Sequence, residues 1–210
     1  LFRGVHSSVA VDRSAGGNLG IDEILSKHLA TKAGDIPGMY DDVIHFIAPR
    51  SQETSVASLR LAGFGDVYLD SQYDNGSDGS VFEYEVIRWT PSTVDGNPQS
   101  LKLPGNGFVN NDLQDLGDDP ETYRWLYLLT NNRSQDDYES IVAFAKVMSL
   151  TGLALEQAAP TVMDVDQWMR TFAQCSLNGT DDILGRIWEH NFRFYVRPGD
   201  GKIIALQWDL

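Results

Sequence analysis

Hydrophobic residues recur at helical spacing in three stretches of the chain. The first predicts a helix over 21–33, and the second predicts a helix over 138–148. The third begins near Asp164 or Asp166 and ends around 177–179, where an Asn-Gly pair is a typical helix terminator. All three are amphipathic, so each should bury one face against the rest of the protein.

Other stretches have the pattern of strands. The apolar run 42–48 is β-rich, and 81–89 alternates between apolar and polar residues. The terminal stretch 191–209 reads as two strands joined by the turn 198–201, which would place Asn191 near Trp208 and Asp209. Helices and antiparallel strands that follow one another in this way indicate an α+β fold.

The connections between these elements divide the chain. A turn-rich acidic loop covers 70–79, and a long connection rich in Gly, Asn, Asp and Pro covers 91–120. We expect strands 42–48 and 81–89 to form a smaller layer. The predicted organisation is a smaller α/β region over 1–120, including the long loop, and a helical region over 121–210 that ends in the hairpin.

Composition limits the possible partners. The 210 residues carry 30 acidic and 16 basic side chains, for a formal charge of −14, which argues against binding nucleic acid or an anionic membrane surface. Basic or metal-bridged partners are easier to accommodate. No apolar stretch approaches the roughly 20 residues needed to span a bilayer. Because the chain starts without Met and stops after a candidate functional Asp, we interpret it as a fragment that lacks parts of both ends.

Several common catalytic signatures are missing. The sequence has no Walker-type loop, no Gly-x-Gly-x-x-Gly and no Gly-x-Ser-x-Gly elbow. Its four histidines are scattered, and its one cysteine, Cys175, falls on an apolar helix stripe, so neither a zinc site nor a cysteine nucleophile is favoured. His45, in an apolar strand, is better interpreted as a core or edge residue than as a metal ligand.

A cluster of oxygen-bearing side chains remains near the C-terminus. Asp181 and Asp182 follow the third helix, and Asn191 and Asp209 flank the hairpin. Carboxylate and amide oxygens are the hard ligands that Mg²⁺ prefers. The order acid, amide, acid matches the base and metal-binding residues of protein kinases, although the spacing differs from the usual kinase loop. The alternative is an ordinary hairpin whose polar residues face solvent, because Asp and Asn are frequent at turns and strand ends.

The residues around these positions resemble a known family. The motifs are Leu177-Asn-Gly-Thr-Asp-Asp182, His190-Asn-Phe-Arg-Phe-Tyr195, Asp200-Gly-Lys202 and Trp208-Asp-Leu210. They resemble the signature Gly-x-x-Asp, Asn-aromatic-x-x-Tyr, Asp/Thr-Gly-Lys and Trp-Asp-x-Asp of the CotH (spore coat protein H-like) atypical protein kinases, in particular their larger secreted bacterial type. Upstream stretches, including 69–72, 76–85, 123–127 and 164–168, are also similar to that family, so the resemblance covers roughly 40–210.

This resemblance implies an atypical protein-kinase-like fold that binds ATP with Mg²⁺, or Mn²⁺ as an alternative ion. The implied reaction transfers the γ-phosphate to Ser or Thr of a secreted or cell-surface protein. By the matching motifs, Asp182 corresponds to the catalytic base, and Asn191 and Asp209 correspond to metal ligands. The second Asp of Trp-Asp-x-Asp is not in the chain, and none of Lys27, Lys32 or Lys102 can be assigned as the cation that holds the phosphates.

The missing lysine motif leaves a second hypothesis open. The chain could be a non-catalytic surface or matrix module with the same fold that binds Ca²⁺ weakly through its acidic loops. The aspartates concerned are Asp70, Asp74, Asp78, Asp112, Asp115, Asp118 and Asp119. Solvated acidic loops without a ligand are the simpler interpretation of the same residues.

Overall fold

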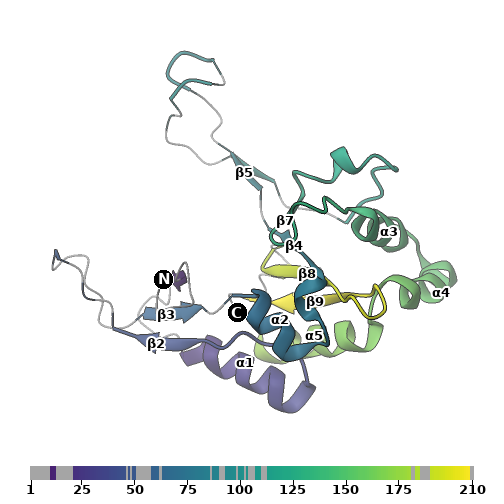
Figure 1. The fold of residues 1–210 in the computed structure, drawn as a ribbon, viewed down its shortest axis with the longest axis horizontal. Coiled ribbons are helices and arrows are strands. Elements are labelled where there is room, and N and C mark those ends of the chain that lie inside the picture. The colour runs from purple at the N-terminus through teal and green to yellow at the C-terminus, as the bar shows by residue number, and fades with distance from the viewer. Residues whose placement is uncertain are drawn as a thin grey trace.

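The structure is a computed structural model. It describes residues 10–12, 21–45, 47, 49–50, 58–61, 63–85, 87–89, 93–97, 99–101, 103, 107–109, 113–180, 183–184 and 190–208. These residues form a mixed arrangement of helices and antiparallel strands, which confirms the predicted α+β class (Figure 1).

A four-stranded antiparallel sheet forms the centre of the fold (Figure 1). Its strands are β4 (Ser80–Tyr84), β7 (Tyr127–Leu129), β8 (Phe192–Val196) and β9 (Ile203–Gln207), in the order β7-β4-β8-β9. The last two make the predicted terminal hairpin, in which Phe192 pairs with Gln207 and Val196 pairs with Ile203. The Arg197 N–H donates to Lys202 O at 2.9 Å, which closes the turn between them.

Helices α3 (Glu139–Met148) and α5 (Val165–Asn178) cover one face of this sheet, and α4 (Gly152–Val162) lies between them in the sequence and packs against α3. Inward-facing aromatic rings dominate the core, and Phe194 lies 5.4 Å from Phe144 and 5.6 Å from Trp168 between ring centroids. Aromatic pairs at such distances add to the free energy gained from burial alone. Both α3 and α5 therefore bury one face against the sheet, as predicted.

The opposite face of the sheet packs against α2 (Asp66–Gln72) and the short 3₁₀ turn η2 (Gly76–Asp78). Tyr195 is central here, because it is fully buried and its hydroxyl donates to Gly76 O at 2.9 Å. A Cβ atom on Gly79 would lie 2.4 Å from Val196 O, so this close approach requires glycine. The stretch 70–79, predicted as a loop, is thus a packed layer that includes the end of a helix.

The N-terminal part forms a separate three-stranded sheet in the order β1-β3-β2. Its strands are β1 (Ala10–Asp12), β2 (Asp42–Ile44) and β3 (Ser58–Leu61), and the helix α1 (Ile21–Gly34) precedes β2. Helix α1 packs against α5, where Gln174 Nε2 donates to Ser26 O at 3.4 Å. Within this part, Lys27 is buried between the carboxylates of Glu23 and Asp41.

Two expectations about strands and helices need correction. The stretch 81–89 is two strands, β4 and β5 (Ile87–Trp89), and β5 pairs with β6 (Gly107–Val109) inside the predicted long connection. Strand β4 lies in the central sheet, so the expectation that 81–89 shares a smaller layer with 42–48 is wrong for β4. Helix α4 was not predicted, because Gly152 and Pro160 resemble loop residues although they occupy its two ends.

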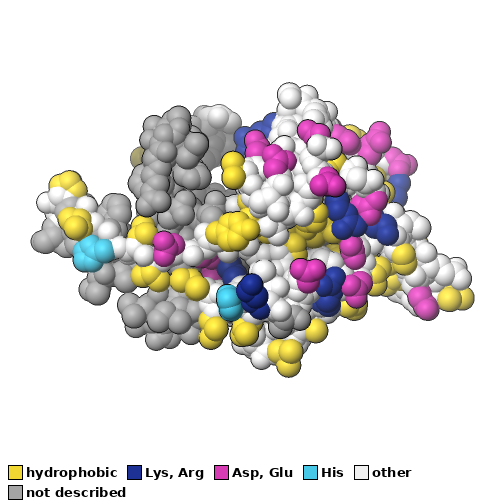
Figure 2. All heavy atoms as spheres, turned by 60° about the horizontal axis from the view of Figure 1, so that its bottom comes forward, with side chains coloured by type: hydrophobic (Ala, Val, Ile, Leu, Met, Phe, Trp, Pro, Cys, Tyr) yellow, Lys and Arg dark blue, Asp and Glu magenta, His cyan; other side chains and the backbone are white. Residues whose placement is uncertain are grey.

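Charged side chains of both signs lie near one another on the surface. Figure 2 shows most of the acidic side chains on the right-hand part of the view, with basic side chains interspersed among them. Several form ion pairs, such as Arg197 with Asp164 at 3.2 Å and Arg170 with Asp166 at 2.8 Å. Among the helices of the described part of the chain, none is both long and apolar enough to cross a membrane.

Candidate functional site

The open end of the terminal hairpin brings together two of the residues named by the sequence. The Trp208 N–H donates to Asn191 O at 3.2 Å, which continues the β8–β9 pairing by one position. This confirms that Asn191 and Trp208 are neighbours. Asp181, Asp182 and Asp209 lie outside the described residues, so their predicted roles remain predictions.

Asn191 has an unusual backbone at this position. Its φ angle is +61°, in the left-handed region that Asn tolerates better than most residues, and it is only 2% exposed. Asn therefore suits this position because it tolerates a left-handed backbone, in addition to the amide oxygen that it carries. The left-handed backbone at Asn191 directs the chain into β8, which begins at the next residue.

A network of charged and aromatic side chains surrounds the same end. Glu85, the first residue after β4, accepts hydrogen bonds at Oε1 from Arg193 Nη1 and from Trp208 Nε1, each at 2.8 Å. Its Oε2 lies 3.5 Å from Nδ1 of His190. The Arg193 guanidinium also pairs with Glu83 at 2.8 Å, and its Cζ lies 4.7 Å from the centre of the Trp208 ring.

The electrostatics of this network are set mainly by burial. Burial raises the pKa of Glu85 above its ordinary value, and the nearby charge and hydrogen bond of Arg193 oppose that effect. The Glu85 side chain is 24% exposed, and the Arg193 side chain is 15% exposed. A carboxylate in such a place is tolerated because several donors converge on it.

A cavity of about 770 Å³ opens beside this network. It is lined by Val81 and Arg193 of the central sheet and by Trp208. The other described lining residues are Met39, Gly63, Phe64, Gly65, Asp66, Thr130, Asn131 and Asn132. A largely apolar cavity with a few polar groups, at this size, is typical of small-molecule sites.

Two asparagines hold the polar wall of this cavity in place. Asn131 Oδ1 accepts from the Val81 N–H at 2.7 Å, and its Nδ2 donates to Gly79 O at 2.8 Å. Asn132 Nδ2 donates to Ser77 O at 2.9 Å. Both side chains therefore tie the stretch after β7 to the packed layer 70–79, and their presence in the wall has a structural explanation.

The cation that would hold phosphates is still unassigned. Lys27 is engaged with Glu23 and Asp41, Lys32 is exposed on α1, and Lys102 lies outside the described residues. Arg193 is the basic side chain among the described residues that line the cavity. Its guanidinium already pairs with Glu83 and Glu85, so we interpret Arg193 as a structural residue of the cavity lining rather than as the phosphate ligand.

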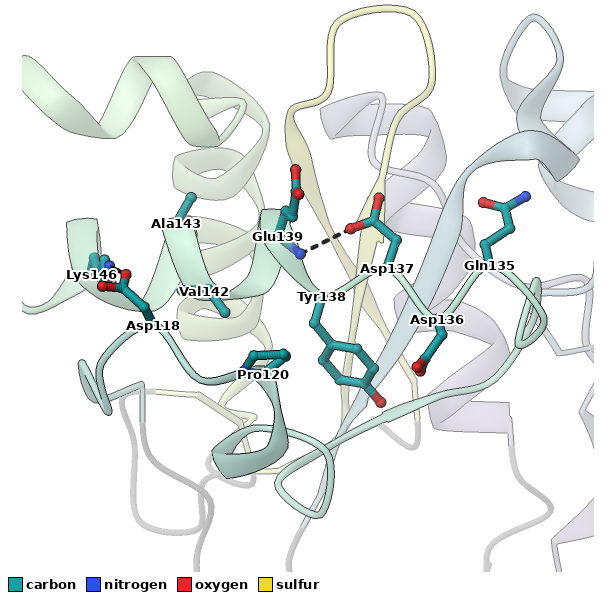
Figure 3. Close-up of a pocket in the computed structure, with 10 residues that line it drawn as sticks. All are labelled: Asp118, Pro120, Gln135, Asp136, Asp137, Tyr138, Glu139, Val142, Ala143 and Lys146. Atoms are coloured by element: carbon teal, nitrogen blue, oxygen red, sulfur yellow. Dashed lines mark hydrogen bonds and ion pairs between the residues drawn. The ribbon is translucent and has the colours of Figure 1, made fainter.

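A second cavity, of about 830 Å³, lies at the start of α3 (Figure 3). It is rich in carboxylates, but they have local partners: Asp118 pairs with Lys146, and Asp137 Oδ1 accepts from the Glu139 N–H at 2.9 Å. Asp136 pairs with Arg124, which also stacks 5.0 Å from the centre of the Tyr138 ring. The described lining residues all come from 118–146, so this cavity does not include the hairpin end.

The acidic loops proposed as weak calcium sites are partly accounted for by local contacts. Asp70 Oδ1 accepts from the Ser77 N–H at 2.8 Å, and Asp115 Oδ1 accepts from the Gly117 N–H at 2.9 Å. Within the described ranges, no group of three or more His, Cys, Asp or Glu side chains lies close enough to hold a metal ion. Asp112 is outside those ranges.

Comparison with known proteins gives no relative: no protein-family model matches the chain, and no curated protein matches it. A functional conclusion therefore depends on the residues and contacts of the hairpin end and its cavity.

Sequence reasoning missed much of this site. Glu85 and Trp208 are 123 positions apart, and nothing in their local sequence indicates that they touch. Arg193 lies within the motif 190–195 but was not singled out, although a lone arginine in a strand that alternates with buried aromatics is a usable signal. The cavity was not foreseen, because its lining comes from six separate stretches of the chain.

Proposed function

We propose that the chain is part of an atypical protein kinase of the CotH type, with a protein-kinase-like fold. It transfers the γ-phosphate of ATP to Ser or Thr of a protein, with Mg²⁺ or Mn²⁺ as the metal. The acceptor is a secreted or surface protein in this proposal, and the acidic charge of −14 favours a basic one.

One observation carries the proposal: the hairpin end adjoins a cavity of nucleotide-compatible size. Trp208 lines the 770 Å³ cavity, and its backbone bonds to Asn191. Asp209 is the next residue in the sequence after Trp208. A metal held by Asn191 and Asp209 would therefore belong to the same end of the sheet as a ligand bound in the cavity.

The cavity has features that suit a nucleotide. Met39, Phe64, Val81 and Trp208 offer apolar surface for a planar base. The stretch Gly63-Phe64-Gly65 has no Cβ at two of its three positions, so a ligand can approach the backbone closely there.

The residues also suit a magnesium ion. Asn191 offers an amide oxygen and Asp209 a carboxylate, and Mg²⁺ is usually bound by one or two carboxylates together with phosphates and water. When bound, the ion offsets the negative charge that develops on the phosphates.

The proposed reaction assigns one role to each residue. The acceptor hydroxyl oxygen forms a bond to the γ-phosphorus, and the bond between that phosphorus and the β–γ bridging oxygen breaks to release ADP. The Asp182 carboxylate orients the hydroxyl and accepts its proton. Asn191 and Asp209 hold the metal in place.

The test is transfer of radiolabelled phosphate from ATP by the complete natural protein with Mg²⁺ or Mn²⁺. We expect label on the protein or on a basic Ser-rich acceptor, and we expect its loss in Asp182→Asn and in Asp209→Asn. Asp200→Asn is the matched control, because Asp200 lies in the turn at the opposite end of the same hairpin. Full transfer by Asp209→Asn would refute the metal assignment, and absence of both transfer and thermal stabilisation by ATP would favour the non-catalytic module.

A further inference from the structure

Three neighbouring strands of the central sheet end together at the candidate site. Tyr84 pairs with Phe192, and Phe192 pairs with Gln207, so the next positions outward are Glu85, Asn191 and Trp208. Glu85 is the one of these three that carries a charge, and its carboxylate points back across the other two strands to reach Arg193 and Trp208.

We propose that Glu85 is a positioning residue that holds His190 and Trp208, the residues that directly precede the two proposed metal ligands in the sequence. This inference rests on the proposed function. Glu85 Oε1 accepts from the indole of Trp208, which directly precedes Asp209. Its Oε2 lies 3.5 Å from His190, which directly precedes Asn191. One carboxylate therefore contacts the residue before each proposed ligand.

The contacts restrict the Trp208 ring in two directions. Arg193 stacks on its face at 4.7 Å, and Glu85 bonds to its edge at 2.8 Å. Arg193 is itself held by Glu83 and Glu85, each at 2.8 Å. A ring bonded at the edge and covered on one face cannot change rotamer without breaking both contacts, so the Trp208 side chain is held in place. Partners of this kind behind metal ligands commonly change metal affinity when they are removed.

Glu83 provides a matched control for this role. It lies on β4 two residues before Glu85, and both glutamates pair with Arg193 at 2.8 Å. The Glu83 side chain is 28% exposed, close to the 24% of Glu85. Replacing either residue with Leu removes the same charge, but only the change at Glu85 removes the acceptor for Trp208 Nε1.

The experiment measures Mn²⁺ affinity by electron paramagnetic resonance of the free ion, with a non-hydrolysable ATP analogue present. We expect Glu85→Leu to weaken Mn²⁺ binding about 10-fold or more. Glu83→Leu should bind Mn²⁺ nearly as tightly as the unmodified protein. Glu85→Gln keeps an oxygen for Trp208 Nε1 and should fall between the two, and it also serves as the folded variant if Glu85→Leu does not fold.

Trp208→Phe separates positioning from a general loss of stability. It removes the Nε1 donor and keeps an aromatic ring for Arg193, so it should weaken Mn²⁺ binding. The effects of Trp208→Phe and Glu85→Leu should not be additive, because both remove the same hydrogen bond. Mn²⁺ affinity unchanged in both Glu85 variants would overturn the positioning role while leaving the kinase proposal intact. An unmodified protein that binds neither Mn²⁺ nor the analogue would refute the proposed function and the positioning role with it.

Discussion

Replacing Gln167 with Leu should lower the free energy of unfolding by about 2 to 3 kcal/mol. Strand β9 is the last strand of the central sheet, and the Gln167 side chain on α5 acts as its partner. Gln167 Nε2 donates to Ala205 O at 2.8 Å, and Gln167 Oε1 accepts from the Ala205 N–H at 3.0 Å. Leu has a similar size but leaves both buried groups of Ala205 without these bonds.

The magnitude follows from these two bonds. Each buried backbone group left without a partner costs about 1–3 kcal/mol, so the pair costs about 4 kcal/mol. Gln167 is only 4% exposed, so Leu is buried there, and its apolar surface offsets about 1–2 kcal/mol of that loss. Urea unfolding followed by circular dichroism measures the difference, with ligand absent.

The control is Gln157→Leu, the same change at an exposed position of α4. It should alter the free energy of unfolding by no more than about 0.5 kcal/mol. A Gln167→Leu variant as stable as this control would refute the idea that α5 substitutes for a missing strand at the edge of β9.

Three further predictions follow from contacts near the hairpin. Burial raises the pKa of Cys175 to about 12, so a thiol reagent at mildly alkaline pH should modify it only after urea unfolding, and rapid modification of the folded protein would contradict the burial. Because Asn191 has a φ of +61°, Asn191→Ala should be less stable than Asn191→Gly by about 1 kcal/mol in the same urea assay, and equal stability would contradict the left-handed backbone. The hydrogen bond from Arg197 lowers the pKa of Asp200, so this pair stabilises the fold above the ordinary pKa of Asp, and the stabilisation is lost as the pH falls through the lowered pKa. The urea midpoint of Asp200→Asn should therefore change less with acid pH than the midpoint of the unmodified protein. Identical pH profiles of the two proteins would contradict the pairing.

The elements predicted correctly are those whose stability is local. The hairpin 191–209 contains a turn with Gly201 at a φ of +69°, and α5 begins with Asp164 accepting from the Gln167 N–H and ends before Gly179 at +73°. Those start and stop signals can be read from neighbouring residues. Strand β7 has no comparable signal, since its three residues become a strand only by pairing with β4.

The site could be predicted only in part for the same reason. Asn191 stood out because of its motif and its place beside a turn-linked strand. Glu85 did not stand out, because in the sequence it is one polar residue of the alternating stretch 81–89. Its role appears only when β4 is inserted between β7 and β8, which places it one position from Asn191 across the sheet. That insertion is a long-range pairing, and long-range pairings are not specified by a local pattern.

A side-chain hydrogen bond joins α5 to β9 close in the sequence to the residues of the proposed reaction. Cys175 Sγ donates to Gln207 Oε1 at 2.8 Å, which joins the last turn of α5 to the last residue of β9. Helix α5 leads directly into Asp181 and Asp182, whereas β9 leads directly into Trp208 and Asp209. The two elements that precede the proposed base and the proposed metal ligand in the sequence are therefore in contact with each other. The proposed reaction needs a proton acceptor and a metal in a defined relative position, and a contact between α5 and β9 joins the two elements that lead to them.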